Sequence, residues 1–380
     1  MNMMAAVSEA KSLRTERLTT LAAVEKISPD WQALGECAWA PAGFHLDGWL
    51  GPVLKTFWKR QPAEILACWR GATLCGLFAL KAGRGPLRQS WTSPLILLGT
   101  PLIDKDLPED VLKTFLTALR DKALLLSAVP VTGPFWDMLE QAVAENNGSI
   151  TILARWERAA LITDGTFEAW FAGNFERKRR KEFRRLRARL GEDGKLESLA
   201  WADGDPLDPW IDELIALEAK GWKGRRGTAL AANAAMATAF REALHRLAAD
   251  GSLRLWKIVF DGKPIAMMSG LVKGNQGWLG KIAYDEAFGR YSPGVMLVLD
   301  ATERLIDREK LALVDSCAIP DHPMINNIWR DRLALCDVMI KGPDLPSTTF
   351  NLLLAAENGR RRLRASAKAL FYRLTRRKKS

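Results

Sequence analysis

The residues best suited to acid–base chemistry lie in one short segment, residues 315–323. It contains Asp315, Cys317, Asp321 and His322, and it follows an apolar stretch that we expect to be a buried strand. The carboxyl ends of strands in α/β proteins commonly display catalytic groups. We therefore predict Asp315 and His322 as catalytic residues, with Asp315 or Asp321 orienting the imidazole.

Two other interpretations of this segment stay open. Cys317 could act as a nucleophile with His322 as its base, although the pair is local in sequence and no third element accompanies it. The segment could also be an ordinary loop whose aspartates accept hydrogen bonds from backbone N–H groups before residues 325–330.

A second segment, residues 290–295, has the composition of an anion site at the start of a helix. Its serine suits the N-cap, its proline suits the first helical position, and its glycine lets a ligand approach the backbone. Its arginine can form a forked contact with phosphate, next to the free N–H groups of the helix start. A simple capped helix is the alternative. The predicted cofactor-binding residues are Arg290, Ser292, Pro293, Gly294 and Val295.

The net charge of +11 is concentrated in two elements of the chain. Residues 176–189 carry nine basic and two acidic side chains, and residues 360–380 carry ten basic and no acidic ones. The rest of the chain therefore holds 36 basic against 42 acidic residues. We expect local contacts with anions rather than a polyanion wrapped over the surface.

The basic tail is predicted to be an amphipathic helix with its apolar residues on one face, namely Leu363, Ala367, Leu370, Phe371 and Leu374. This pattern is typical of a helix that lies on anionic lipid, and a tail docked on its own protein is the alternative. Neither basic element carries the interleaved aromatic residues of a nucleic-acid platform, which disfavours nucleic acid as a partner.

The length and composition indicate an ordinary globular protein of about two domains. The chain has 380 residues, of which 48% are apolar, and it contains neither a secretory signal nor an apolar run long enough to span a membrane. We expect a cytoplasmic protein, with the basic tail available for contact with the inner face of the membrane. The five cysteines lack metal-site spacing, so we expect reduced thiols and no metal.

The elements that would position these residues follow from periodicity and turn residues. In the first half we expect two short helices within 29–59, a hairpin over 64–81, helices at 109–122 and 134–145, and strands at 123–129 and 149–156. In the second half we expect a helix at 166–190, a strand at 195–201, helices at 207–221 and 231–249, a three-stranded meander over 253–284, a helix at 295–307, and strands at 311–315 and 333–341.

Four segments of the second half carry a family resemblance: FERKRRKEFRRLRARL at 175–190, EAKGWKGRRGTAL at 218–230, LWKIVFDGKPIAMMSG at 255–270 and KIAYDEAFGRYSPGVML at 281–297. Together with the order of meander, loop, helix and buried strand, they resemble the GNAT acetyltransferases. The closer resemblance is to the BioF2-like or cellulose-biosynthesis-type branch, which is related to the Fem-like peptidyltransferases. The segment Arg-Tyr-Ser-Pro-Gly replaces the usual Gln/Arg-x-x-Gly-x-Gly/Ala loop.

The resemblance implies roles for further residues. Backbone N–H groups of Lys281, Ile282 and Ala283 would face the carbonyl of an acyl-CoA thioester, and Tyr284 could protonate the leaving thiolate, with packing at a strand end as its alternative. Glu218, Trp222 and Lys223 match the family's Glu-x-x-x-Trp-Lys pattern and would border the acceptor. By helical spacing, Glu218 and Trp222 would share one face.

The predicted fold is a mixed α+β protein of two tandem GNAT-like domains. We expect a flexible start at 1–26, a first domain at 27–160, a GNAT acyltransferase domain at 161–345 and a basic amphipathic tail at 346–380. The predicted activity is direct transfer of an acyl group, acetyl above all, from acyl-CoA to an amine or hydroxyl of a sugar, a polysaccharide or lipid precursor, or an amino compound.

Two alternatives to this activity stay open. Fem-like relatives use aminoacyl-tRNA as the donor, and the chain could follow them, although the long helical hairpin of those enzymes is not evident in the sequence. It could also be a non-catalytic binder that uses a GNAT scaffold and its basic helices to hold a membrane or nucleic acid.

Overall fold

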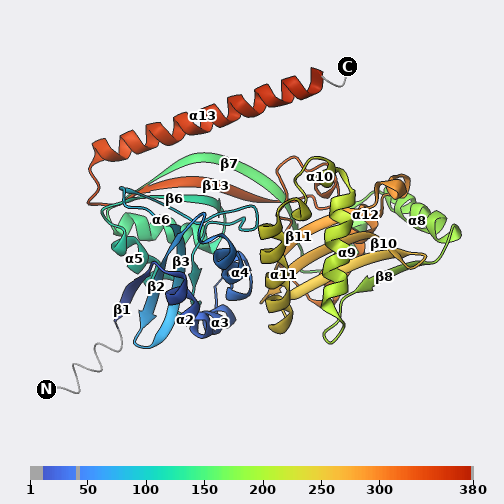
Figure 1. Cartoon of the computed structure of the whole chain (residues 1–380), viewed down its shortest axis with the longest axis horizontal. Helices are drawn as coiled ribbons and strands as arrows, with labels where there is room; N and C mark the ends of the chain where they lie inside the picture. The colour runs from blue at the N-terminus through green and yellow to red at the C-terminus, as the bar shows by residue number, and fades with distance from the viewer. Residues whose placement is uncertain (1–11, 40–42, 378–380) are drawn as a thin grey trace.

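The fold consists of two halves, each built from strands and helices in a similar order (Figure 1). The computed structural model describes residues 12–39 and 43–377, with side chains up to residue 368. Of the start predicted to be flexible, residues 1–11 lie outside the described residues. Further along, Leu13–Leu18 form a strand that pairs along its whole length with the first strand of the predicted hairpin, and Leu21–Lys26 form a helix.

The first half runs from a strand through helices to a hairpin and then alternates helix and strand. Its elements are β1 (Leu13–Leu18), α2 (Leu21–Lys26), α3 (Ser28–Glu36), a 3₁₀ turn (Gly43–His45), α4 (Asp47–Phe57), β2 (Ala63–Arg70), β3 (Thr73–Lys81), β4 (Leu87–Gln89), β5 (Leu102–Ile103), α5 (Pro108–Ala118), β6 (Ala123–Pro130), α6 (Pro134–Glu145) and β7 (Ser149–Ile162).

The second half repeats the succession of strand, helices, meander, helix and strand. Its elements are α7 (Phe167–Asn174), α8 (Arg177–Glu192), β8 (Leu196–Ala200), α9 (Leu207–Lys220), α10 (Trp222–Arg225), η2 (Leu230–Ala232), α11 (Ala234–Ala249), β9 (Leu253–Phe260), β10 (Lys263–Lys273), β11 (Gln276–Tyr284), η3 (Glu286–Tyr291), α12 (Pro293–Glu303), a π turn (Arg304–Arg308), β12 (Leu313–Asp315), η5 (Ile325–Asn327), β13 (Asp331–Lys341) and α13 (Ser347–Arg377).

One long sheet joins the two halves. Nine strands follow one another in the order β4-β6-β13-β7-β12-β11-β10-β9-β8, while β1, β2, β3 and β5 form a separate sheet. The strand β13 belongs to the second half by sequence, yet it lies between β6 and β7 of the first half and pairs antiparallel with both. The prediction of a mixed α+β fold with mixed sheets is thus confirmed. Strands from both halves are hydrogen-bonded to one another within the nine-stranded sheet.

The predicted helix over 166–190 is interrupted at its middle. Phe175 and Glu176 are extended, so α7 ends before them and α8 starts after them. The break turns the Phe175 ring into the core, where it lies 5.4 Å from the ring of Phe171 and 5.2 Å from that of Phe183. Burial of an aromatic ring outweighs the loss of a few helical hydrogen bonds.

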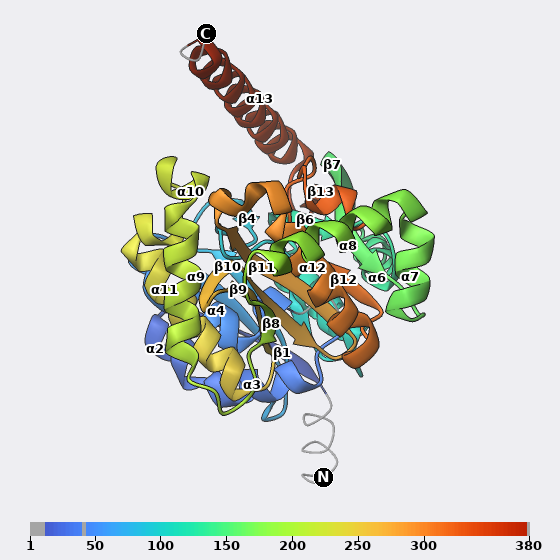
Figure 2. The same ribbon diagram turned by 90° about the vertical axis from the view of Figure 1, so that its right-hand side faces the viewer.

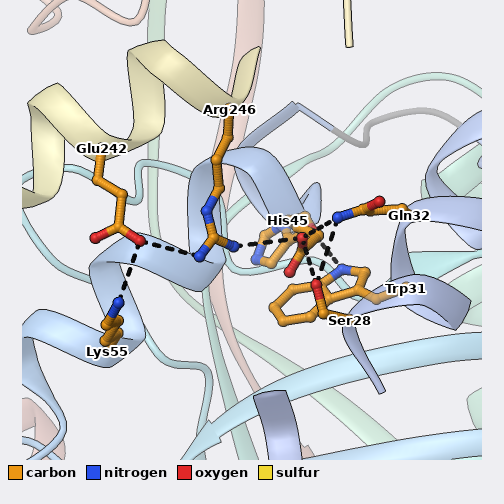
Figure 3. A network of polar contacts seen from close by, with 8 residues as sticks. Ser28, Trp31, Gln32, His45, Lys55, Glu242 and Arg246 are labelled. Atoms are coloured by element: carbon orange, nitrogen blue, oxygen red, sulfur yellow. Dashed lines mark hydrogen bonds and ion pairs between the residues drawn. The ribbon is translucent and has the colours of Figure 1, made fainter. Parts of the chain in front are cut away.

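The helices α4 and α11 pack against each other across the two halves, and one apolar core continues through both. A polar network borders this contact (Figure 3). Arg246 of α11 lies 3.5 Å from Asp47 of α4, and Glu242 lies 3.5 Å from Lys55 and 3.0 Å from Arg246. Asp47 also accepts hydrogen bonds from Ser28 and Gln32.

Acid should weaken the fold through His45. Its side chain is fully buried, its Nδ1 lacks a partner among the described residues, and burial lowers its pKa from 6.5 to about 4. The unfolded chain therefore binds a proton more readily, and stability falls as the pH drops from about 6.5 towards 4. We expect a loss of about 2 kcal/mol between pH 7 and pH 5, measured by urea unfolding.

The matched variants are His45→Gln and His245→Gln. Replacing buried His45 should remove most of this pH dependence, whereas replacing exposed His245 should leave it in place. An unchanged pH dependence in His45→Gln would contradict the assignment.

Candidate functional site

The site begins where two parallel strands separate. β11 and β12 pair only from Gln276 to Trp278 and from Leu313 to Asp315. β11 continues to Tyr284, and on that side residues 279–284 have no strand partner in the described part of the chain. The separation leaves an edge of backbone donors and acceptors beside the loop that follows β12.

The helix α12 starts next to this edge. Its N-cap, Ser292, has left-handed backbone angles, with φ 55° and ψ 53°, and its side chain forms no capping hydrogen bond. The predicted hydroxyl cap is therefore wrong. Instead, the Ser292 carbonyl accepts from the N–H groups of Val295 and Met296, at 3.0 and 3.2 Å. A left-handed serine costs about 1–3 kcal/mol, and such strain often occurs at functional sites.

Arg290 precedes this helix and extends toward solvent. Its side chain is 76% exposed, its guanidinium lies over the Tyr291 ring at 4.6 Å, and it is 3.9 Å from the Asp193 carboxylate. The Tyr291 hydroxyl donates to the same carboxylate. The first turn of α12 contains no acidic residue. Within the described residues, Gly294 has the one N–H of the first turn that no other group accepts, because Pro293 has no N–H and that of Val295 donates to Ser292. Together, this N–H and the Arg290 cation form a surface that fits a phosphate.

Three elements converge on Gly294 at the start of α12. A methyl group on Gly294 would lie 3.0 Å from Sδ of Met324, in the loop after β12, and 3.4 Å from Cδ1 of Tyr284, at the end of β11. The predicted loop, Tyr284 and the segment containing His322 are therefore neighbours. The flexible thioether of Met324 is the part of this contact that can move.

On the β11 side, a buried ion pair holds the strand edge. Glu218 at the end of α9 is 2% exposed, and its carboxylate accepts from Lys223 Nζ at 2.9 Å and from the Leu230 N–H at 2.8 Å. Lys223 Nζ also donates to the Ile282 carbonyl at 3.1 Å. Of the three residues predicted by the Glu-x-x-x-Trp-Lys pattern, Glu218 and Lys223 thus meet at the site.

Trp222 does not share a face with Glu218, contrary to the helical-spacing prediction. Gly221 is extended and separates α9 from α10, so the Trp222 side chain is 42% exposed while Glu218 is buried. Gly224 then brings α10 back against α9, because a methyl group there would lie 1.7 Å from the Ala219 carbonyl oxygen.

Lys281 is a residue whose side chain the sequence did not single out. It lies at a bulge between β10 and β11, where its N–H donates to Ser269 Oγ at 2.9 Å. Burial lowers the pKa of its amine, the Glu218 charge raises it, and the Lys223 charge lowers it further, for a net decrease. The lowered pKa makes the neutral amine of Lys281 more accessible than that of an exposed lysine.

His322 lies in the loop after β12 with one ring nitrogen already engaged. Its Nδ1 accepts hydrogen bonds from the N–H groups of Met324 and Ile325, both at 3.3 Å. Burial and the Lys223 charge lower its pKa, so the neutral ring is favoured. A neutral ring that accepts at Nδ1 carries its proton on Nε2. The groups that orient this ring are backbone amides, which replace the predicted Asp315 or Asp321.

Asp315 is committed to a buried ion pair. Its carboxylate contacts Arg158 of β7, and both side chains are at most 5% exposed. It also accepts from the Cys317 N–H at 2.8 Å. Burial, with the Asp315 charge as a further cause, raises the pKa of the Cys317 thiol well above its usual value. Asp315 therefore has a structural role, and Cys317 lacks the thiolate character of a nucleophile.

A cavity of ≈ 810 Å³ lies between the two halves, next to the point where the strands separate. Its lining includes Trp278 and Asp315, the last paired residues of β11 and β12, together with Trp39 and Phe135 from the first half. The site thus has room beside it for a second molecule. Among the described residues, no group of three His, Cys, Asp or Glu side chains could hold a metal ion.

One known domain family matches most of the second half. Residues 177–322 match the acetyltransferase (GNAT) domain family. This segment therefore has the GNAT fold. The match starts with α8 and ends at His322, so it includes the strand edge, the start of α12 and the first part of the loop after β12. No curated protein sequence is similar enough to be counted as a relative.

Solved structures resemble most of the chain, including parts outside residues 177–322. FemX has 9% sequence identity and a TM-score of 0.56, with 89% of this chain and 100% of that chain covered. The C-terminal domain of a putative lysylphosphatidylglycerol synthetase from Agrobacterium fabrum has 11% identity and a TM-score of 0.54, with 88% of this chain and 95% of that chain covered. At these identities the similarity concerns the fold alone. The expected relationship to GNAT proteins rests on the family match over residues 177–322.

The lowered pKa of Lys281 can be tested by chemical labelling. We expect the Lys281 amine to react with acetic anhydride at a lower pH than exposed lysines such as Lys178, as followed by mass spectrometry. Glu218→Gln removes the charge that raises this pKa, so the labelling curve should shift to still lower pH. Equal titration of Lys281 and Lys178 would contradict the assignment.

The Arg158–Asp315 pair generates a stability prediction. Asp315→Asn leaves the buried guanidinium without its counter-charge, so we expect a loss of about 3–5 kcal/mol in urea unfolding. Replacing both partners, by Arg158→Met with Asp315→Leu, should recover much of that loss. A loss in the double variant at least as large as in Asp315→Asn would contradict the account.

Proposed function

We propose that the chain is an acyltransferase that moves an acyl group, acetyl above all, from acyl-CoA to an amine or hydroxyl of a polar acceptor. The observation that carries the proposal is the separation of β11 from β12 directly beside the start of α12. This arrangement offers a phosphate-binding helix start and an unpaired strand edge within one site, which suits a long donor with a phosphate at one end and a carbonyl at the other.

The donor would bind along α12 and the edge of β11. Arg290 and the Gly294 N–H would hold its pyrophosphate, and Ser292, Pro293 and Val295 would form the surrounding backbone of the helix start. Acyl-CoA, when bound, supplies the acyl group as a thioester. Of the three predicted backbone donors, the Lys281 N–H already donates to Ser269 Oγ, so the N–H groups of Ile282 and Ala283 remain to orient the thioester carbonyl. The Met324 side chain would move aside for the donor arm.

Proton transfer would involve side chains on both sides of the strand edge. The neutral amine of Lys281 would accept the proton of the acceptor N–H or O–H, and the nearby Glu218 carboxylate would stabilise the resulting ammonium. The His322 Nε2–H would donate a hydrogen bond into the site, and the Tyr284 hydroxyl would return a proton to the departing sulfur. Asp315 would support the loop through Arg158.

The acceptor would enter from the cavity between the halves. Trp39, Phe135 and Trp278 offer apolar and aromatic surfaces there, and Lys105, Lys273 and Arg332 offer polar contacts. This mixture suits a ring-containing polar compound, such as a sugar or a glycan or lipid precursor, better than a wholly apolar one.

A second candidate donor, aminoacyl-tRNA, is favoured by the helix α8. Two of its nine basic residues form ion pairs, Arg185 with Glu182 and Arg187 with Asp300, while the others form none within the described residues. The helix α8 contacts η3, the turn that contains Arg290. α8 has more cations than are required to bind one pyrophosphate. Its position next to Arg290 would suit a donor with many phosphates.

Binding of acetyl-CoA should raise the melting temperature by several degrees at millimolar concentration. Arg290→Ala should reduce the shift, because the guanidinium is the cation next to the start of α12. Arg308→Ala, at the end of the π turn that follows α12, is the matched control and should keep the full shift. The measurement is thermal unfolding with acetyl-CoA, longer acyl-CoAs or total tRNA.

The same measurement separates the two donors. A shift with acyl-CoA but not with tRNA supports the first proposal, and a strongly salt-dependent shift with tRNA alone supports the second. If neither ligand shifts the melting temperature, both donor assignments fail.

A further inference from the structure

The C-terminal helix α13 has two faces with different environments. One face is docked on the body: Phe350 and Glu357 are buried, Leu353 and Leu354 pack with Met339 of β13, and Arg361 pairs with Asp337 at 2.7 Å. The helix lies along the outer side of the first half in Figure 1 and projects from the body in Figure 2. The docked face fixes its orientation.

The opposite face of α13 is apolar and exposed. Leu352 is 72% exposed and Leu363 is 73% exposed, the two largest exposed fractions among the large apolar side chains of the described residues. They lie three helical turns apart, on the same side of the helix. Ala356 and Gly359 lie between them on that side, and Ala356 is exposed. We call Leu352, Ala356, Gly359 and Leu363 the outer stripe.

Cations flank the outer stripe. Arg362 and Arg364 are exposed and form no ion pair within the described residues. Arg360 forms an ion pair with Glu357 on the docked side. The sequence contains no acidic residue after Glu357, and further cations follow at Arg373, Arg376, Arg377, Lys378 and Lys379. The outer stripe is therefore an apolar surface within a strongly positive segment.

We propose that α13 docks the protein on an anionic lipid bilayer through the outer stripe. Leucines on one side of a helix, with arginines at their margins, match the composition of a helix that lies in a membrane interface. Anionic headgroups complement the cations, whereas a second copy of α13 would bring two positive segments together. The docked face keeps the helix rigidly oriented, so the body lies on the side of α13 away from the bilayer.

None of the helices in the described part of the chain combines the length and hydropathy needed to cross a membrane. The proposed attachment is accordingly peripheral, and it depends on both charge and apolar contact. Neither contribution suffices alone, because the stripe is narrow and isolated cations bind weakly to a bilayer at physiological salt. This dependence makes the two contributions separately testable.

The experiment is co-sedimentation of the full chain with vesicles of phosphatidylcholine, with or without about one third phosphatidylglycerol. We expect binding to the anionic vesicles and at least ~10-fold weaker binding to phosphatidylcholine alone. Leu352→Asp with Leu363→Asp, and separately Arg362→Glu with Arg364→Glu, should each weaken the anionic binding by at least ~10-fold. Circular dichroism and melting temperature check that these exposed substitutions leave the fold intact.

Two control variants match these changes elsewhere on the surface. Ile162→Asp removes an exposed apolar residue, and Arg177→Glu with Lys178→Glu removes two cations from α8. Both should keep the vesicle binding of the original chain. Loss of binding in the α8 variant, with retention in both α13 variants, would overturn the proposal.

Two further outcomes would also overturn it. Equal binding to both vesicle types would show that the charge plays no part. A dimer in sedimentation without vesicles, abolished by the Leu352 and Leu363 substitutions, would assign the outer stripe to a second copy of the chain instead.

Discussion

The insertion of β13 between β6 and β7 is the constraint on which the rest of the structure depends. β13 pairs with β6 on one side and with β7 on the other, and so fixes the position of β7. β7 in turn pairs with β12. β12 then holds the paired part of β11. The place where β11 separates from β12 thus depends on β13, which comes near the end of the sequence. One continuous sheet connects the two halves.

The buried pair of Arg158 and Asp315 lies at this junction and links β7 to the end of β12. Because Asp315 also accepts from the Cys317 N–H, the pair determines the direction in which the following loop leaves the sheet. That loop carries Met324 to the start of α12 and places His322 with its Nδ1 on backbone amides. Asp315, which the sequence suggests as a catalytic residue, therefore acts by fixing the position of the loop that carries Met324 and His322.

The features that the sequence predicts correctly depend on local chemistry. The turn between β9 and β10 has Asp261 and Gly262 at φ 47° and 76°, and this Asp-Gly dipeptide is itself the signal for a tight hairpin. Proline at the start of α12 likewise marks a helix start. By contrast, the breaks at Phe175 and Gly221 depend on what those residues pack against, so helical spacing alone predicts helices that run too far.

The site shows the same limit. The segments around Arg290 and His322 could be found from residue types, because helix starts and strand ends are recognisable in sequence. The partner of Asp315 is Arg158, 157 residues earlier in the chain, and the surroundings of Lys281 come from α9, α10 and β10 together. Such non-local contacts leave no spacing pattern in the sequence. Only the structure shows that Asp315 is held in a structural ion pair and that Lys281 lies beside the strand edge with a lowered pKa.

The position of β13 also has a consequence for biosynthesis. The ribosome completes β6 and β7 long before it reaches residues 331–341, so the nascent first half has a gap in its sheet while most of the second half is still being made. Unpaired strand edges of this kind attract wrong partners. We expect the chain to depend on chaperones or on rapid translation of its second half, and to be sensitive to rare codons placed between β7 and β13.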